Sequence, residues 1–202
     1  MKNFKFLSIG IALASVSAAH ATSFSNVNIQ SPPLSTGATW TSLGNSVSFF
    51  LPNAIVGDPV SPLRAGTLNI QYDAHTPGPA VANEVGVNLG AALSGSGTIF
   101  FQEQVFELDI NGNEVAGGPI GVITHTFNPG GPTTWSGTIN FSRSVERLRA
   151  KKFFTMSATD TAAFDLASIG IVNQNIQVVP EPATMAAVGL GVAALMRRRK
   201  RS

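Results

Sequence analysis

The chain has 202 residues, with 13 Lys and Arg, 11 Asp and Glu, and no cysteine. The lack of cysteine excludes disulfides and cysteine-ligated metal sites. The length is sufficient for one domain with its own hydrophobic core, in addition to terminal targeting segments.

Residues 1–21 have the pattern of a secretory signal peptide. Two lysines in the first five residues precede an apolar segment, residues 6–16, and small residues lead to Ala19-His20-Ala21, an A-x-A cleavage motif. We expect export by the Sec machinery, with signal peptidase cleaving after Ala21 and leaving Thr22 as the N-terminus.

The positive charge of the chain lies in its two ends. The whole sequence has a formal net charge of +2, but the body from Thr22 to Val179 has six Lys and Arg against ten Asp and Glu, a net charge of −4. A mildly acidic body argues against nucleic acid as a partner.

Alternating apolar and polar side chains predict β-strands along the body. The longest candidate is residues 98–110, where a change of apolar parity predicts a bulge near 102–104. Asn111-Gly112 then predicts a hairpin with a return strand at 120–127. The other strand segments are Val27–Ile29, Val47–Leu51, Leu68–Tyr72, Val85–Leu89, Trp135–Phe141, Phe153–Ala158 and Phe164–Val178.

Short strands separated by Gly, Pro and Asn predict an all-β fold. We expect an antiparallel β-sandwich or jelly roll formed by residues 22–179, flanked by an N-terminal signal helix and a short C-terminal transmembrane helix. Residues 76–79 are expected to form a loop, and residues 144–150 are the one segment with a predicted helical turn. Adjacent Phe pairs, such as Phe100-Phe101 and Phe153-Phe154, place one ring on each face of a strand.

No catalytic motif is evident. His75 lies in a predicted loop and His125 in a predicted strand, and neither is near a nucleophile-elbow motif. Glu103 and Glu107 are the best carboxylates for an alternative in which the protein hydrolyses glycosides, but residues of this spacing more simply form a solvated strand face.

We predict no cofactor and no metal site. Asp109-Ile110-Asn111-Gly112-Asn113 has oxygen-bearing side chains at alternate positions, as a calcium loop does. However, the sixth and twelfth positions of an EF-hand loop would be Glu114 and Ile120, so the pattern fails and hairpin turn chemistry accounts for these residues.

A basic cluster lies between residues 143 and 152. Arg147, Arg149 and Lys151, with Arg143 and Lys152 nearby, are candidates for contact with an anionic glycan. The alternatives are pairing with the acidic group around Glu103–Glu114 and protection of an edge strand by charge.

The last two dozen residues have three ordered parts. Val179-Pro180-Glu181-Pro182 is extended by its prolines, and residues 183–196 form an uncharged apolar segment of roughly 21 Å as a helix. A basic cluster follows, which favours a cytoplasmic location for that end: Arg197, Arg198, Arg199, Lys200 and Arg201.

This tail resembles the PEP-CTERM sorting signal of Gram-negative bacteria. The resemblance covers residues 180–202 together with Val179 and does not extend to the body. It implies recognition and cleavage near Pro-Glu-Pro by an exosortase, a transient anchor in the inner membrane, and export linked to exopolysaccharide or biofilm matrix.

Two classes of function follow. The first is an exported, non-enzymatic protein of the cell surface or extracellular matrix, compatible with a glycan-binding module that contacts exopolysaccharide. The second is an exported carbohydrate-active enzyme that uses acidic residues such as Glu103 and Glu107.

Overall fold

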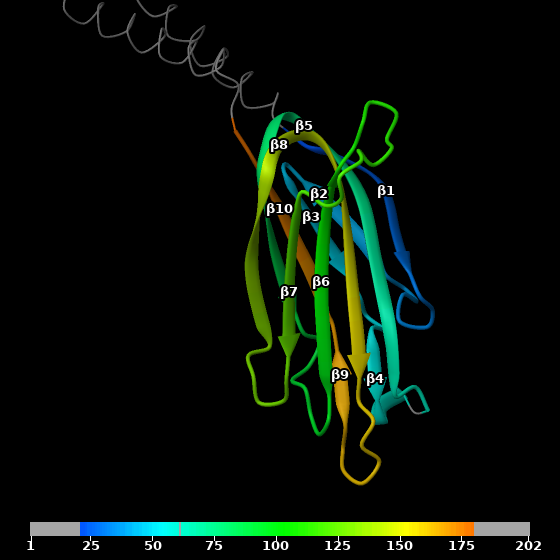
Figure 1. The fold of residues 1–202 in the computed structure, drawn as a ribbon. Coiled ribbons are helices and arrows are strands. Elements are labelled where there is room, and N and C mark those ends of the chain that lie inside the picture. The colour runs from blue at the N-terminus through cyan, green and yellow to red at the C-terminus, as the bar shows by residue number, and fades with distance from the viewer. Residues whose placement is uncertain (1–20, 61, 180–202) are drawn as a thin grey trace, which may run out of the picture.

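The computed structural model describes residues 21–60 and 62–179, which form an antiparallel all-β, sandwich-like fold (Figure 1). Besides the short 3-10 turn η2 (Asp58–Val60), the elements in these residues are β1 (Ser23–Gln30), β2 (Thr39–Leu43), β3 (Ser46–Phe50), β4 (Ile55–Gly57), β5 (Ala65–Asn88), β6 (Thr98–Glu107), β7 (Gly121–Phe127), β8 (Thr134–Ser157), β9 (Leu166–Ser168) and β10 (Ile171–Val178).

Two long strands, β5 and β8, connect the two layers of the sandwich. Residues 65–75 of β5 pair with β1 and with residues 147–157 of β8, which pair in turn with β6, and β6 with β7. This first layer has the order β1-β5-β8-β6-β7. Residues 82–88 of β5 pair with residues 134–140 of β8 and with β10, and the second layer continues through β3 to β2. The long strands turn from one layer to the other where their register shifts, between His75 and Ala82.

The core lies between these layers and contains rings from both. The Phe49 ring of the second layer lies 5.8 Å from the Tyr72 ring of the first, and Phe101 of β6 stacks on Phe154 of β8 at 4.8 Å. All four rings are buried. The prediction for adjacent Phe pairs is confirmed, because Phe100 is 44% exposed beside buried Phe101.

Most predicted strands are present, but three local predictions are wrong. β6 pairs with β8 in unbroken register from Thr98 to Glu107, so there is no bulge at 102–104. Residues 144–150 belong to β8 and are not helical, and residues 76–79 belong to β5 and are not a loop. The hairpin prediction is confirmed, since Leu108 bridges to Glu114 across the Asn111-Gly112 turn and β7 begins at Gly121.

Strands β4 and β9 form a separate two-stranded sheet at one end of the sandwich (Figure 1). Among the residues that the structure describes, no helix is both long and apolar enough to cross a membrane. The predicted signal peptide and the transmembrane helix at 183–196 lie outside the described residues, apart from Ala21.

Candidate functional site

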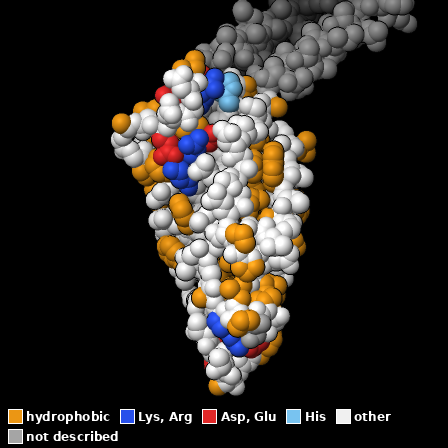
Figure 2. Space-filling model, turned by 90° about the vertical axis from the view of Figure 1, so that its right-hand side faces the viewer, with side chains coloured by type: hydrophobic (Ala, Val, Ile, Leu, Met, Phe, Trp, Pro, Cys, Tyr) orange, Lys and Arg blue, Asp and Glu red, His pale blue; other side chains and the backbone are white. Residues whose placement is uncertain are grey.

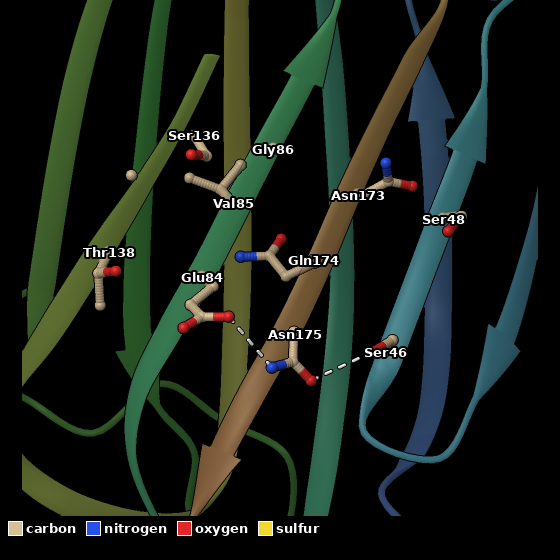
Figure 3. A pocket seen from close by; sticks show the side chains of 11 residues that line it. Ser46, Ser48, Glu84, Val85, Gly86, Ser136, Thr138, Asn173, Gln174 and Asn175 are labelled. Atoms are coloured by element: carbon tan, nitrogen blue, oxygen red, sulfur yellow. Dashed lines mark hydrogen bonds between the residues drawn. The ribbon is translucent and has the colours of Figure 1, made fainter. Parts of the chain in front are cut away.

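A polar groove crosses the outer face of the second layer (Figure 3). It has a volume of about 580 Å³ and is formed by four adjacent strands, β3, β10, β5 and β8. Antiparallel register places the lining side chains in two rows. One row is Ser48, Asn173, Gly86 and Ser136, and the other is Ser46, Asn175, Glu84 and Thr138.

The strand period explains why this face is polar. Along β10 the side chains of Val172, Gln174 and Ile176 are buried, whereas Asn173 and Asn175 alternate with them and point outward. Serine, threonine and asparagine at the outward positions supply hydroxyl and amide groups, which both donate and accept hydrogen bonds.

Glycine makes the middle of the groove hollow. Gly86 lies between Asn173 and Ser136 in the first of these rows, and a Cβ built there would have no neighbour nearer than 3.9 Å. The missing side chain therefore leaves space above the sheet, and larger residues would fill the hollow without colliding with the backbone.

One carboxylate, that of Glu84, lines the groove and is held by amide groups. Asn175 Nδ2 donates to Glu84 Oε2 at 3.3 Å, and Gln177 Nε2 donates to Oε1 at 2.5 Å. Ser46 Oγ donates to Asn175 Oδ1 at 3.1 Å, as Figure 3 shows. This network orders the side chains at one end of the groove.

Glu103 is not on a solvated face, so that part of the sequence prediction is wrong. It continues the inward parity of Ile99, Phe101 and Val105 and has no exposed surface. Glu107, at the end of the same strand, instead accepts a hydrogen bond from Arg143 at a half-exposed position. The two carboxylates proposed for glycoside hydrolysis are thus not presented together to solvent.

The carboxylate of Glu103 is the centre of a buried polar cluster. Its Oε2 accepts a hydrogen bond from Lys152 Nζ at 2.5 Å, and its Oε1 accepts from Asn83 Nδ2 at 2.9 Å and from Gln174 Nε2 at 2.7 Å. All four side chains are at most 2% exposed. Burial lowers the pKa of Lys152, and the charge of Glu103 opposes that effect.

The predicted basic cluster is divided between the two faces of β8. Arg149 donates to both oxygens of Asp73, at 2.6 and 2.8 Å, and Lys151 Nζ lies 2.6 Å from Glu114. Arg147 shares the outer face with them, whereas Lys152 points into the core. The structure therefore brings Arg149 and Lys151 into contact with carboxylates, as the pairing alternative expected.

The two histidines are far apart in the fold. His75 is exposed on β5, where it pairs with Ser23 of β1. His125 lies on β7 and stacks on Trp135 at 4.5 Å between ring centroids, and the partial burial lowers its pKa. Its contacts are those of a packed aromatic residue.

The Asp109 turn is built by local hydrogen bonds. Asp109 Oδ1 accepts from the backbone N–H groups of Asn111 and Asn113 at 2.8 and 2.9 Å. These bonds, of which the bond from the backbone N–H of Asn113 contributes most, lower the pKa of Asp109. They account for the residues that resembled a calcium loop.

Both ends of the body lie at the same end of the sandwich. The Thr22 backbone N–H donates to Asn45 Oδ1 at 3.1 Å, and the Ile176 N–H donates to the Asn45 carbonyl at 2.9 Å. Val179 donates to the Pro79 carbonyl at 2.9 Å. The segments expected to be removed thus join the body next to each other.

The sequence of the tail settles its type. Residues 178–201 match the PEP-CTERM protein-sorting motif. The chain carries a PEP-CTERM sorting tail. This motif implies export, a membrane-associated C-terminal signal and processing by an exosortase, as the resemblance of the tail predicted. The sorting residues from Pro180 onward, including the basic cluster, lie outside the described residues.

No family is assigned to the body, and no curated protein matches the chain. The body has low similarity to solved structures of carbohydrate-binding modules. TmCBM61 in complex with β-1,4-galactotriose has 11% identity and a TM-score of 0.36, covering 76% of this chain and 90% of that chain. The family 11 module of Clostridium thermocellum with a mixed-linked tetrasaccharide has 10% identity and a TM-score of 0.27, with coverage of 80% and 88%. A CBM28 module specific for non-crystalline cellulose has 14% identity and a TM-score of 0.31, with coverage of 75% and 87%. Similarity at this level does not establish a shared ligand.

Sequence reasoning did not identify the groove. Its residues come from four segments, near residues 47, 85, 137 and 174, that become neighbours only through the strand order. The local signal was a set of polar outward positions with a glycine at the centre of a strand. That signal indicates a solvated strand face, but it does not show which strands lie next to one another in the sheet.

Proposed function

We propose that this protein is an exported, non-enzymatic component of the cell surface or extracellular matrix whose body binds a neutral polysaccharide. The observation that carries this proposal is the groove across β3, β10, β5 and β8, lined by hydroxyl and amide side chains. Four strands spaced about 4.8 Å apart give the groove a length of roughly 14 Å, enough for a few units of a sugar chain.

The chemistry of the groove favours a neutral ligand over an anionic one. The sugar hydroxyls of a polysaccharide are donors and acceptors, which suits Ser48, Ser136 and Asn173. Glu84 would repel an anionic polymer. Arg149 and Lys151, which the sequence suggested as glycan contacts, lie on the first layer and not in the groove, and the carboxylates of Asp73 and Glu114 neutralise them there.

The distribution of charge supports the same choice. On the face shown in Figure 2, the charged side chains gather near the two ends of the molecule, and the surface between them is uncharged. The ion pairs Arg149–Asp73 and Arg64–Asp58 lie in the first layer and next to the β4–β9 sheet, respectively. This side, where β1 lies in Figure 1, is not the groove face, and it offers an anionic polymer no extended basic surface.

The alternative of a carbohydrate-active enzyme has less support. General acid–base hydrolysis of a glycoside uses two carboxyl groups on either side of the bond. Among the described residues that line the groove, Glu84 is the one carboxylate. An assay for new reducing ends, with the neutral polysaccharides used below, tests this alternative directly.

The sorting tail gives this binding activity a location. We propose that signal peptidase and an exosortase remove residues 1–21 and the tail, so that residues 22–179 reach the cell surface or the matrix. The inner membrane would hold the protein transiently, before tail cleavage, and exopolysaccharide would be its partner afterwards.

Affinity electrophoresis of the protein through gels that contain soluble β-glucan, mannan or alginate tests the proposal. We expect retardation by a neutral polymer and none by anionic alginate. Asn173→Ala and Ser136→Ala should each weaken binding by about 2- to 12-fold, because a hydrogen bond contributes about 0.5–1.5 kcal/mol.

Matched controls come from the opposite outer face. Thr126→Ala, on β7, should leave binding unchanged. The double variant Phe100→Ala/Phe153→Ala removes the two exposed rings of that face, which are 44% and 37% exposed. If only this double variant loses binding, the ligand stacks on the first layer and the groove is not the site.

A further inference from the structure

We propose that Lys152, Glu103 and Asn83 form a self-processing site in which Lys152 Nζ attacks the side-chain amide of Asn83 and forms an isopeptide bond. The product would be a covalent cross-link between the two layers of the sandwich. This inference is independent of glycan binding.

The three side chains come from three strands and meet in the core. Lys152 on β8 and Glu103 on β6 are directly paired residues of the first layer. Asn83 lies in the half of β5 that belongs to the second layer. Lys152 and Asn83 both donate to Glu103, one to each carboxylate oxygen, at 2.5 and 2.9 Å. One carboxylate therefore holds the nucleophile and the amide next to each other.

The surroundings activate Lys152 as a nucleophile. An amine attacks only when it is neutral, and burial lowers the pKa of Lys152. Glu103 is the base within reach of Nζ. The Tyr72 ring centroid lies 5.7 Å from Nζ, and Tyr72, Lys152, Glu103 and Asn83 all have no exposed surface. The cluster is thus closed to bulk water, which disfavours hydrolysis of the amide.

We assign Asn83 as the acceptor, since its Oδ1 is buried and has no hydrogen-bond partner among the described residues. Gln174 Oε1 is likewise buried without a partner among these residues, so the digest below distinguishes the two amides. Once Glu103 has taken the proton from Lys152 it becomes a donor, and rotation of the Asn83 amide brings Oδ1 to that proton. Protonation of the carbonyl oxygen stabilises the tetrahedral intermediate.

The reaction balances without any added reagent. The bond from Lys152 Nζ to Asn83 Cγ forms and the bond from Cγ to Nδ2 breaks. Glu103 accepts one proton from the Lys152 ammonium, relays a second from the attacking nitrogen to the leaving group, and ends as a neutral acid. One ammonia leaves. The buried ammonium and carboxylate are replaced by neutral groups, which removes the cost of keeping two charges in the core.

Such a bond suits an exported chain that has no cysteine. A disulfide would be the usual covalent link outside the cytoplasm. A cross-link from β8 to the second half of β5 would instead tie the first layer to the second through the middle of the core.

The test is peptide mapping of the purified full-length protein after digestion with trypsin and a Glu-specific protease. We expect a branched species in which residues 65–84 are attached to the peptide that begins at Lys152, minus the mass of one ammonia. Cleavage after Lys152 should be blocked. Two unlinked peptides in the folded protein would overturn the proposal.

The same digest distinguishes the other acceptors. A branch to residues 85–107, with loss of water and no cleavage after Glu103, would make Glu103 the acceptor and overturn the role of Asn83. A closed loop within the peptide that begins at Lys152 would make Gln174 the acceptor, with the same consequence. Each of these results would be seen in the protein without any substitution. None of these outcomes therefore depends on whether a variant folds.

Variants then assign the roles. Lys152→Arg keeps the charge but removes the nucleophile and should abolish the branched species. Glu103→Gln keeps both Lys152 and Asn83 and should also abolish the branched species. If Glu103 only packed beside the two reactants and transferred no proton, this variant would still form the cross-link. Gln174→Leu is the matched control in the same cluster and should retain the full cross-link.

Discussion

Gly57 and Gly112 both have positive φ angles, 111° and 81°, but very different surroundings. A Cβ at Gly57 would collide with the backbone oxygen of Asp165, which precedes β9 directly, whereas a Cβ at Gly112 would meet nothing within 4 Å. Gly112→Ala should therefore cost only the backbone strain, about 1–2 kcal/mol. Gly57→Ala should cost about 1–3 kcal/mol more, from the collision. Urea unfolding of both variants measures the difference, and equal losses would contradict the predicted collision.

The burial of Glu103 could not be predicted from the sequence around it. Glu103 has the parity of Phe101, but the later apolar residues Phe106, Leu108 and Ile110 have the other parity. The sequence therefore predicted a bulge near 102–104 and a solvated position for Glu103. The carboxylate is tolerated because Lys152, Asn83 and Gln174 donate to it. These partners lie 20 to 71 residues away in sequence, so local pattern does not reveal them.

At the scale of elements, alternation predicted the strands but not their continuity. Residues 76–79 contain two prolines, which lack the N–H for a ladder, and the segment resembled a loop. It is the corner where β5 passes from one layer to the other. The matching corner of β8 shifts its inward parity between Val145 and Leu148. Buried residues three apart resemble a helix, which explains the wrong helical prediction at 144–150.

The contact of β7 with β8 has a predicted pH dependence. His125 of β7 stacks on Trp135 of β8, and partial burial lowers its pKa in the folded state below the usual value of about 6.5. Just below pH 6.5 the unfolded chain therefore binds a proton that the folded chain does not, and stability falls as the pH drops. A single group with an unfolded pKa of about 6.5 can contribute at most about 1.4 kcal/mol of such a loss between pH 7.5 and 5.5.

Thermal or urea unfolding at both pH values measures this effect. His125→Gln is the control, because it keeps a polar planar side chain but does not titrate. The fall in stability that comes from protonation of His125 should be absent in this variant. An unchanged pH dependence would mean that His125 does not titrate differently in the folded and unfolded states.

At the scale of the molecule, the sequence predicted the fold class and the tail but not the site. Serine, asparagine and glycine positions such as Ser136, Asn173 and Gly86 are ordinary outward strand residues until β8, β5 and β10 are placed side by side. The strand order depends on long-range pairing, for which the local pattern holds no signal. The tail is different, because its apolar segment, prolines and arginines act through their order along the chain.

The last prediction concerns what remains of the chain after sorting. We expect protein recovered outside the cell to begin at Thr22 and to end near Pro180–Pro182, as intact-mass and C-terminal peptide analysis would show. Both ends of the described body make their own hydrogen bonds, Thr22 to Asn45 and Val179 to Pro79, so trimming at these points removes no strand.

A Glu181→Ala variant tests whether the motif causes the release. It should leave the body unchanged and accumulate with an intact tail in the cell envelope, since the substitution lies beyond Val179, the last described residue of the body. If the unaltered protein itself stays in the inner membrane with its tail intact, the tail acts as a permanent anchor. The groove would then face the periplasm, and its polysaccharide ligand would be sought there and not in the matrix.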